Sequence, residues 1–135
     1  NSYSDALDID FSHVNIENID ITGSRNDCVD VSFGKYDFTF LNLDKCGDKG
    51  LSVGEKSEII INKVAIDNSK LGIASKDGSS VNIFHANIKN VNTCLASYNK
   101  KPEFSGGYIK IDKFICDNYV NENVIDDHSK ILLLK

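Results

Sequence analysis

The 135-residue chain is long enough for one domain and too short for two of ordinary size. Its hydrophobic fraction of 41% is typical of a globular protein, and no apolar run approaches the ~18 residues that a membrane span needs. The net charge of −5 argues against a phosphate-binding surface of clustered Lys and Arg, so we do not expect nucleic acid as a partner. We also expect no membrane span.

The domain organisation follows from the length. The chain starts at Asn1 and contains no Met. We therefore expect a single domain, residues 1–135, that is a fragment of a larger protein.

Short segments with alternating apolar residues recur along the chain at intervals of about 22 residues. "GLSVGEKSEIII" from Gly50 and "GIASKDGSSVNI" from Gly72 are the clearest pair. Such segments are too short for helices and are typical of buried strands. In chain order they are 7–9, 14–16, 19–21, 29–31, 36–38, 41–43, 51–53, 59–61, 64–66, 73–75, 81–83, 86–88, 95–97, 109–111, 114–116 and 131–133, with Val124 opening a partial sixth copy.

Three short strands per repeat of about 22 residues predict an all-β fold, a right-handed parallel β-helix of about six rungs. Each rung stacks on the next at about 4.8 Å, so each must bury the same columns of side chains. A leucine-rich repeat is excluded because its fixed leucine pattern is missing. Asn68, Asn90 and Asn118 align at one corner, where Asn tolerates a tight turn and can bond to the residue in the next rung.

The strings "GDKGLSVGEKS", "LGIASKDGSSV" and "NKKPEFSGGYI" resemble the right-handed parallel β-helix repeats of secreted bacterial and phage proteins, among them polysaccharide lyases and bacterial surface proteins. The resemblance implies a scaffold and an extracellular or cell-surface location. It does not choose a function, because the same scaffold carries lyases, hydrolases, epimerases, adhesins and inert spacers.

The four cysteines are expected to be free thiols packed as small apolar side chains. Cys28 and Cys94 share a column but lie three rungs apart, about 14 Å. That separation exceeds the ~7 Å limit between the Cα atoms of a disulfide. Cys46 has no cysteine above or below it in its column.

A group of carboxylates lies on the first strand of the first two rungs. Asp8 and Asp30 should stack directly, and Asp5 and Asp27 form a second pair with the same offset, followed by Lys49 in that column. Carboxylates this close repel one another, so something should compensate. The alternatives are a solvated acidic edge relieved by Lys49, a Ca²⁺ site made by Asp5, Asp8, Asp27 and Asp30, and a catalytic carboxylate cluster.

Further along the same strand face, the outward positions are Ser52, Ala74, Ala96 and Ile125. The small side chains predict a flat strip in the middle rungs. Such a strip suits a sugar chain or the backbone of a partner, and it equally suits a covering segment or no function at all.

The largest departure from the period is a six-residue insertion in "SYNKKPEFSGG", residues 97–107. Insertions in solenoids gather on the binding face. Aromatic rings beside cations suit a sugar or uronate, although the loop could equally fold over the core with its Phe packed down. The candidate ligand-binding residues are Lys76, Tyr98, Lys100, Lys101 and Phe104.

The function expected from these features is a non-catalytic scaffold or interaction module that binds carbohydrate or a cell-surface partner. The alternative is a polysaccharide lyase or related enzyme with a Ca²⁺ site at the first-strand carboxylates. The acidic patch and the basic loop are expected to lie about three rungs apart, which favours the non-catalytic interpretation. The run Ile131–Leu134 and the short N-terminal segment would leave both ends of the solenoid uncapped, so we also expect self-association.

Overall fold

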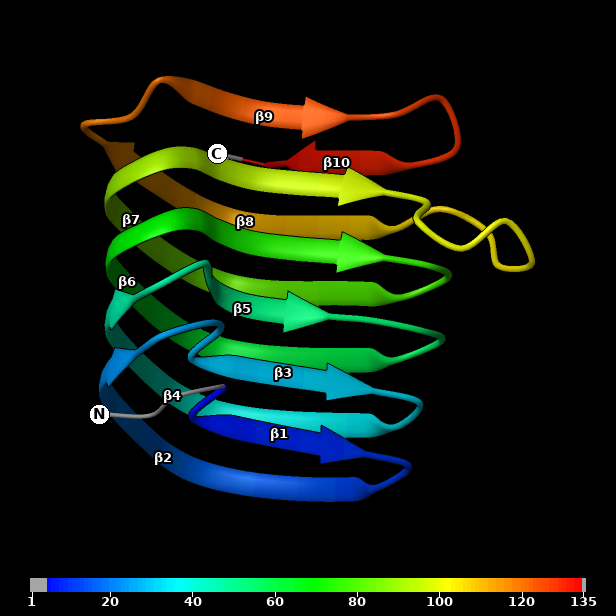
Figure 1. The fold of residues 1–135 in the computed structure, drawn as a ribbon, viewed down its shortest axis with the longest axis horizontal. Helices are drawn as coiled ribbons and strands as arrows, with labels where there is room; N and C mark the ends of the chain where they lie inside the picture. Colours follow the sequence, from blue (N-terminus) through cyan, green and yellow to red (C-terminus); the bar gives the residue numbers. More distant parts are fainter. Residues whose placement is uncertain (1–4, 135) are drawn as a thin grey trace.

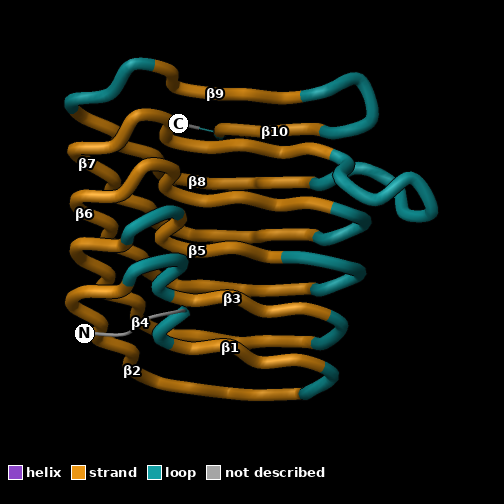
Figure 2. The backbone as a smooth tube through the Cα atoms, viewed as in Figure 1, coloured by secondary structure: helices purple, strands orange, loops and turns teal. Residues whose placement is uncertain are grey.

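The computed structural model describes residues 5–134 as a parallel β-solenoid of about six turns, which confirms the predicted fold class (Figure 1). Strands and the loops between them make up this part of the chain (Figure 2), and it contains no helix with the length and hydrophobicity of a membrane-spanning segment. The strands are β1 (Leu7–Asp10), β2 (His13–Ser24), β3 (Val29–Ser32), β4 (Lys35–Cys46), β5 (Lys49–Val53), β6 (Glu58–Lys76), β7 (Ser80–Tyr98), β8 (Tyr108–Asp117), β9 (Asn121–Ile125) and β10 (Lys130–Leu133).

Every rung stacks on the next by parallel pairing, and we number the rungs by the residues that begin them. These six residues form one register column: Leu7, Val29, Leu51, Ile73, Leu95 and Asn123. The first face contains β1, β3, β5, the C-terminal ends of β6 and β7, and β9. The second face comprises the strand segments that begin at His13, Lys35, Glu58, Ser80, Tyr108 and Lys130. The third face comprises their continuations from Asn18, Phe40, Lys63, His85 and Lys113.

The strands are longer than the alternating segments predicted, because the chain bends at corners without leaving the ladder. β6 and β7 each run for 19 residues through two corners. The bend after the third face is made by residues with positive φ in one column. Asn adopts this left-handed backbone conformation at a lower energetic cost than most residues. The predicted Asn column is therefore confirmed, and its members are Gly23, Lys45, Asn68, Asn90 and Asn118.

The corner amides bond along the solenoid axis. Asn118 Nδ2 donates to Asn90 Oδ1 at 2.7 Å, as predicted for stacked asparagines. Asn90 Nδ2 instead donates to Asp67 Oδ1 at 2.8 Å, one position to the side of the column. The side chains thus support the corner between neighbouring rungs.

The core is a continuous set of apolar columns between the three faces; it is fully buried in rungs 2 to 4, whereas Phe114 and Cys116 on the third face of rung 5 are only partly buried. Phe38, Ile59, Val81 and Ile109, for example, are fully buried on the second face. Burial of one such side chain stabilises the fold by roughly 1.5–3 kcal/mol. In rung 1, by contrast, the inward residues are only partly buried, because no rung within residues 5–134 packs on their other side: Leu7, Ile9, Val14, Ile16, Ile19 and Ile21.

Rung 6 differs from the sequence prediction by one residue. Val124, rather than Ile125, aligns with Ala96, so Ile125 does not belong to the outward column of the first face. As a result Asn123 occupies the inward column, and all of β9 is exposed. Among residues 5–134 no further rung packs on β9, so nothing within this range requires the apolar alternation there. Ile131 and Leu133 do continue the inward columns of Ile109 and Ile111, as predicted.

The prediction of four free thiols is wrong. Cys28 and Cys46 form a disulfide with Cα atoms 5.3 Å apart, and Cys94 and Cys116 form another with Cα atoms 6.5 Å apart. The prediction considered only cysteines that stack above one another in the same column of different rungs. Each bridge instead crosses one corner within a rung, because the residue before the first face returns close to the end of the third face after a full turn. Both disulfides therefore close the same corner, in rungs 2 and 5.

Candidate functional site

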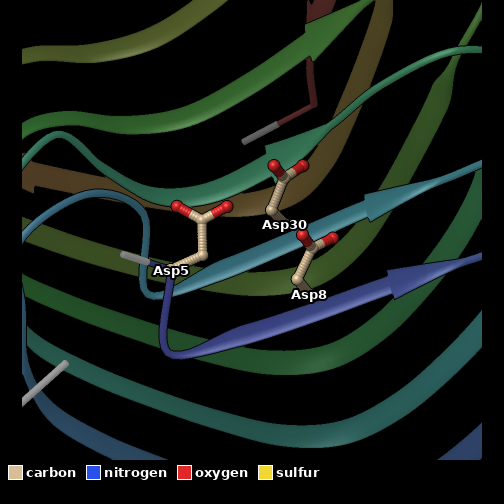
Figure 3. A group of neighbouring side chains, drawn as sticks. All are labelled: Asp5, Asp8 and Asp30. Atoms are coloured by element: carbon tan, nitrogen blue, oxygen red, sulfur yellow. The ribbon is translucent and has the colours of Figure 1, made fainter. Parts of the chain in front are cut away.

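Three carboxylates converge at the N-terminal end of the first face. Asp5 precedes β1, Asp8 lies on β1 and Asp30 on β3, and one oxygen of each lies within 4.8 Å of the others (Figure 3). Asp8 and Asp30 are direct ladder neighbours, as predicted. Burial raises the pKa of Asp30 to about 7, helped by a hydrogen bond with Asp5 and the negative charge of Asp27. The Asp30 carboxyl is therefore partly protonated near neutral pH.

Asp27 does not join this acidic cluster. Its amide N–H donates to Asp5 Oδ1 at 2.9 Å, and its own Oδ1 accepts from the backbone N–H of Lys49 at 3.0 Å. Lys49 Nζ lies 3.8 Å from Asp27 Oδ1 and 2.9 Å from Asp48 Oδ2. Lys49 thus follows Asp27 in its column, as predicted, and it compensates the buried carboxylate there.

The acidic cluster has the oxygen ligands that a hard cation such as Ca²⁺ prefers. Within residues 5–134, Asp5, Asp8 and Asp30 form the single group of three or more side chains suited to holding a metal ion. Three of the four residues predicted for the Ca²⁺ site are therefore together, and the fourth serves another contact. The Ca²⁺ site itself stays a prediction.

The strip of small residues in the middle of the first face is not an open surface. Ser52 and Ala74 have no exposed area and Ala96 has 4%. Lys76 folds back over Gly54, its neighbour in rung 3 beside the strip, since a Cβ placed on Gly54 would lie 3.5 Å from Lys76 Cε. Tyr98, in the same column as Lys76, is also half-buried. Side chains of the protein itself cover the strip, so it offers no groove for a ligand.

The same side chains reduce the separation expected between the acidic patch and the basic residues. The charge of Lys76 opposes the burial that raises the pKa of Asp30, so its ammonium lies within electrostatic reach of Asp30. Burial raises the pKa of Tyr98, and the charge of Lys49 acts in the opposite direction. Lys76 and Tyr98 therefore extend toward the N-terminal rungs and away from the tip of the insertion.

The insertion between β7 and β8 is anchored by one buried carboxylate. Asp77 is fully buried, and its Oδ1 accepts from the backbone N–H groups of Lys100 and Lys101 at 2.7 and 2.8 Å. Asn99 Nδ2 donates to Asp77 Oδ1 and to carbonyls of the loop. Gly78, with φ of +79°, leaves the space in which the loop lies against the rung. The insertion is therefore held in place by hydrogen bonds from its backbone to the buried Asp77 carboxylate.

The side chains at the tip of the insertion fold back over earlier rungs. Lys101 Nζ pairs with Glu55 Oε1 at 3.0 Å. The ring of Phe104 contacts the ring of Phe33 edge-on, with centroids 6.0 Å apart. Lys100 remains exposed. The structure thus divides the predicted ligand-binding residues: Lys76 and Tyr98 belong to the first face, whereas Lys101 and Phe104 contact a corner that the sequence analysis did not identify.

This corner, between the first and second faces, presents phenylalanine rings to solvent. Phe11 and Phe33 both have positive φ, 52° and 48°, and their rings stack with centroids 4.7 Å apart and planes 5° apart. Phe11 is 75% exposed. Lys56 also has positive φ, and its Nζ lies 5.8 Å from the centroid of Phe104. We call Phe11, Phe33, Lys56 and Phe104 the aromatic corner.

The signal for the aromatic corner was present in the sequence. Phe11 and Phe33 are one repeat apart, like the residues of the predicted core columns. These two phenylalanines lie outside the alternating apolar positions that predict the core, because they occupy a turn. A search for repeated residues at turn positions would have found them.

No model of a known protein family, no curated protein and no solved structure matches this chain. The structure therefore defines a class, the parallel β-solenoids, and no narrower family. The function has to be argued from the surface of this molecule.

Proposed function

We propose that the chain is a non-catalytic β-helix module of a larger extracellular or cell-surface protein, and that it binds carbohydrate at the aromatic corner. The observation that carries the proposal is the pair of stacked phenylalanines, Phe11 and Phe33, held at the surface with positive φ. A left-handed backbone costs a bulky residue about 1–2 kcal/mol, and strain of this kind concentrates at functional sites. Neither ring is needed to fill the core.

The chemistry of the corner supports a sugar as the ligand. One face of the Phe11 ring packs on Phe33, and the exposed remainder offers an apolar platform on which the C–H face of a pyranose ring can stack. Lys35 and Lys56 lie around a shallow hollow beside the rings, together with His13 and Glu58. Polar groups beside an aromatic platform are what a sugar ring requires, because its edge carries hydroxyls.

The two disulfides support the extracellular location in the proposal. Disulfides persist in oxidising compartments and are rare where thiols are kept reduced. Cys28–Cys46 and Cys94–Cys116 account for all four cysteines of the chain.

The test is a panel of neutral and acidic polysaccharides in affinity electrophoresis. We expect retardation of the wild-type chain by at least one polysaccharide, and loss of it in Phe11→Asn and Phe33→Asn. Asn tolerates positive φ, as it does at the corner between the third and first faces, so these variants should fold. Phe40→Thr is the matched control, because Phe40 is an exposed phenylalanine on the third face. Equal retardation of the wild type and Phe11→Asn would contradict the proposal.

The second candidate is a polysaccharide lyase or related enzyme, and the acidic cluster favours it. Asp30, with its raised pKa, lies beside two further carboxylates and within reach of Lys76. The same panel of polysaccharides distinguishes the two functions. A lyase would release unsaturated products that absorb in the ultraviolet, whereas the binding module would release none.

A further inference from the structure

We propose that the carbohydrate site does not end at the aromatic corner but continues as a furrow across the second face to a second stacking position at Phe84. This inference rests on the proposed function and names the ligand class: an extended chain of neutral hexopyranose units. The furrow is made of three shallow hollows of about 320, 310 and 360 Å³ that follow one another. The first contains the aromatic corner residues Phe11, Phe33 and Lys56.

The hollows are continuous because each shares lining residues with the next. His13, Lys35 and Glu58 line both the first hollow and the second. Asp37 and Ile60 line both the second hollow and the third. The path therefore leaves the corner, crosses rungs 2 and 3 on the second face, and reaches rungs 4 and 5.

The far end of the furrow repeats the composition of the corner. Phe84 is 51% exposed and Ile60 is 58% exposed, which is unusual for large apolar side chains in the middle of a sheet. Lys113 Nζ lies 5.7 Å from the centroid of the Phe84 ring. Asn62 and Asn82 lie in the same hollow and supply amide donors and acceptors next to the apolar surface.

Register places these residues on a regular grid. Ile60, Asn82 and Lys110 are successive members of one ladder column, and Asn62 and Phe84 lie two residues further along the same strands. Apolar and amide side chains thus alternate along and across the furrow. A pyranose chain presents a matching set of groups, since its ring faces are apolar and can contact apolar side chains, and its ring edges carry hydroxyls that can bond to amides.

Charge and backbone pairing select a neutral sugar chain over other polymers. The furrow is lined by three lysines and three carboxylates, so it has no net attraction for a polyanion. An extended peptide would need an unpaired strand edge, but the second-face strands of rungs 2 to 5 are paired on both sides. The columns of Phe11 and Phe84 are six residues apart along the strand, about 20 Å, and the two residues are three rungs apart, about 14 Å, so the furrow spans roughly 24 Å, the length of several sugar units.

The experiment is isothermal titration calorimetry with oligosaccharides of two to six units, derived from cellulose, mannan and chitin. We expect the affinity of the wild-type chain to rise by about tenfold or more between the dimer and the hexamer of the sugar that binds. In Phe84→Thr, the hexamer should bind no better than the dimer, and the affinity for the dimer should be unchanged. Thr suits a strand, and the control Phe40→Thr makes the same change outside the furrow and should keep the full gain.

The possible failures are distinguishable. If Phe84→Thr binds the hexamer as the wild type does while Phe11→Asn loses binding, the furrow is wrong and the carbohydrate site at the corner stands. If dimer and hexamer bind the wild type equally, the site has no extension and the inference is overturned. If none of the neutral oligosaccharides binds while a polysaccharide still retards the wild type in affinity electrophoresis, the inference is overturned and the proposed function stands; if neither binds, both fail.

Discussion

Asp30 is a partly buried carboxyl group on the first face of the solenoid. Its pKa is raised from 3.8 to about 7, mainly by burial. In the unfolded chain the proton leaves near pH 4, whereas the folded protein retains it. The folded state therefore binds more protons between these values, and the free energy of unfolding should fall as the pH rises from about 4 to about 7.

We expect this fall to be about 1–2 kcal/mol, because solvent screening reduces the value that the full shift would give. Urea unfolding in chelator at a series of pH values measures it. Asp30→Asn keeps the shape of the side chain without its titration, and its curve should be flatter by that amount. An identical pH slope in Asp30→Asn would show that Asp30 ionises normally.

Ca²⁺ addition tests the acidic cluster directly. A cation that binds only the folded state stabilises it by mass action, by about 1 kcal/mol at a few times its Kd. We expect thermal melts at pH 8 to shift upward with millimolar Ca²⁺ and to return with chelator. Asp30→Asn should lose the shift, and Asp27→Asn should keep it, because Asp27 is engaged by Lys49. A melting midpoint of the wild type that does not change with Ca²⁺ would rule the site out.

Asp77 anchors the insertion through a single oxygen. Substitution by Asn and substitution by Ala should therefore differ in their effect on the free energy of unfolding. Asp77→Asn retains the Oδ1 that accepts the three donors and replaces Oδ2, which is buried without a partner among the described residues. Asp77→Ala removes the acceptor and should cost about 2–4 kcal/mol. We expect Asp77→Asn to cost less than about 1 kcal/mol in urea unfolding. Equal losses in both variants would mean that the negative charge itself is required.

At the scale of elements, the disulfides fix the corner between the third and first faces in rungs 2 and 5. They close short segments of 18 and 22 residues, for which chain entropy gives about 3 kcal/mol of stabilisation each. The denatured chain should show no reactive thiol before reduction and four after it. Four thiols without reductant would restore the expectation drawn from the sequence.

The elements also show where sequence reasoning works in this fold. The columns through Val29, Leu51 and Ile73 followed from the repeat alone, because every interior rung is held between two others. The six-residue insertion was placed correctly for the same reason: Val81 and Ile109 align although they are 28 residues apart. Rung 6 was misaligned by one residue, because it has a neighbour on one side only.

The candidate site was less predictable, since it depends on where long side chains fold. A repeat gives the position of Cα atoms but not the direction of Lys76 or Tyr98, which cover the strip expected to be open. It also does not reveal that Phe104 returns to Phe33, a contact between residues 71 positions apart. The stacked pair Phe11 and Phe33 does follow the 22-residue period, but at a turn position, where the alternating apolar pattern of the strands gives no signal.

At the scale of the whole molecule, the two ends of the solenoid are the regions least covered. β2 pairs with β4 alone and β9 with β7 alone, and the inward residues of rung 1 are only partly buried. Unpaired strand edges bind other edges. We expect the 135-residue chain to self-associate, most simply as a dimer, with a mass that rises with concentration in light scattering. A constant monomer mass at high concentration would contradict this.

The central claim is that this solenoid binds a sugar chain along the furrow that begins at the aromatic corner. The most direct measurement is a titration of the ¹⁵N-labelled chain with the oligosaccharide that binds, followed by amide chemical shifts. We expect shifts at Phe11, Phe33 and along the second face to Phe84, with Asp8 and Asp30 unchanged. Shifts centred on the first-face carboxylates, with the aromatic corner unmoved, would contradict it.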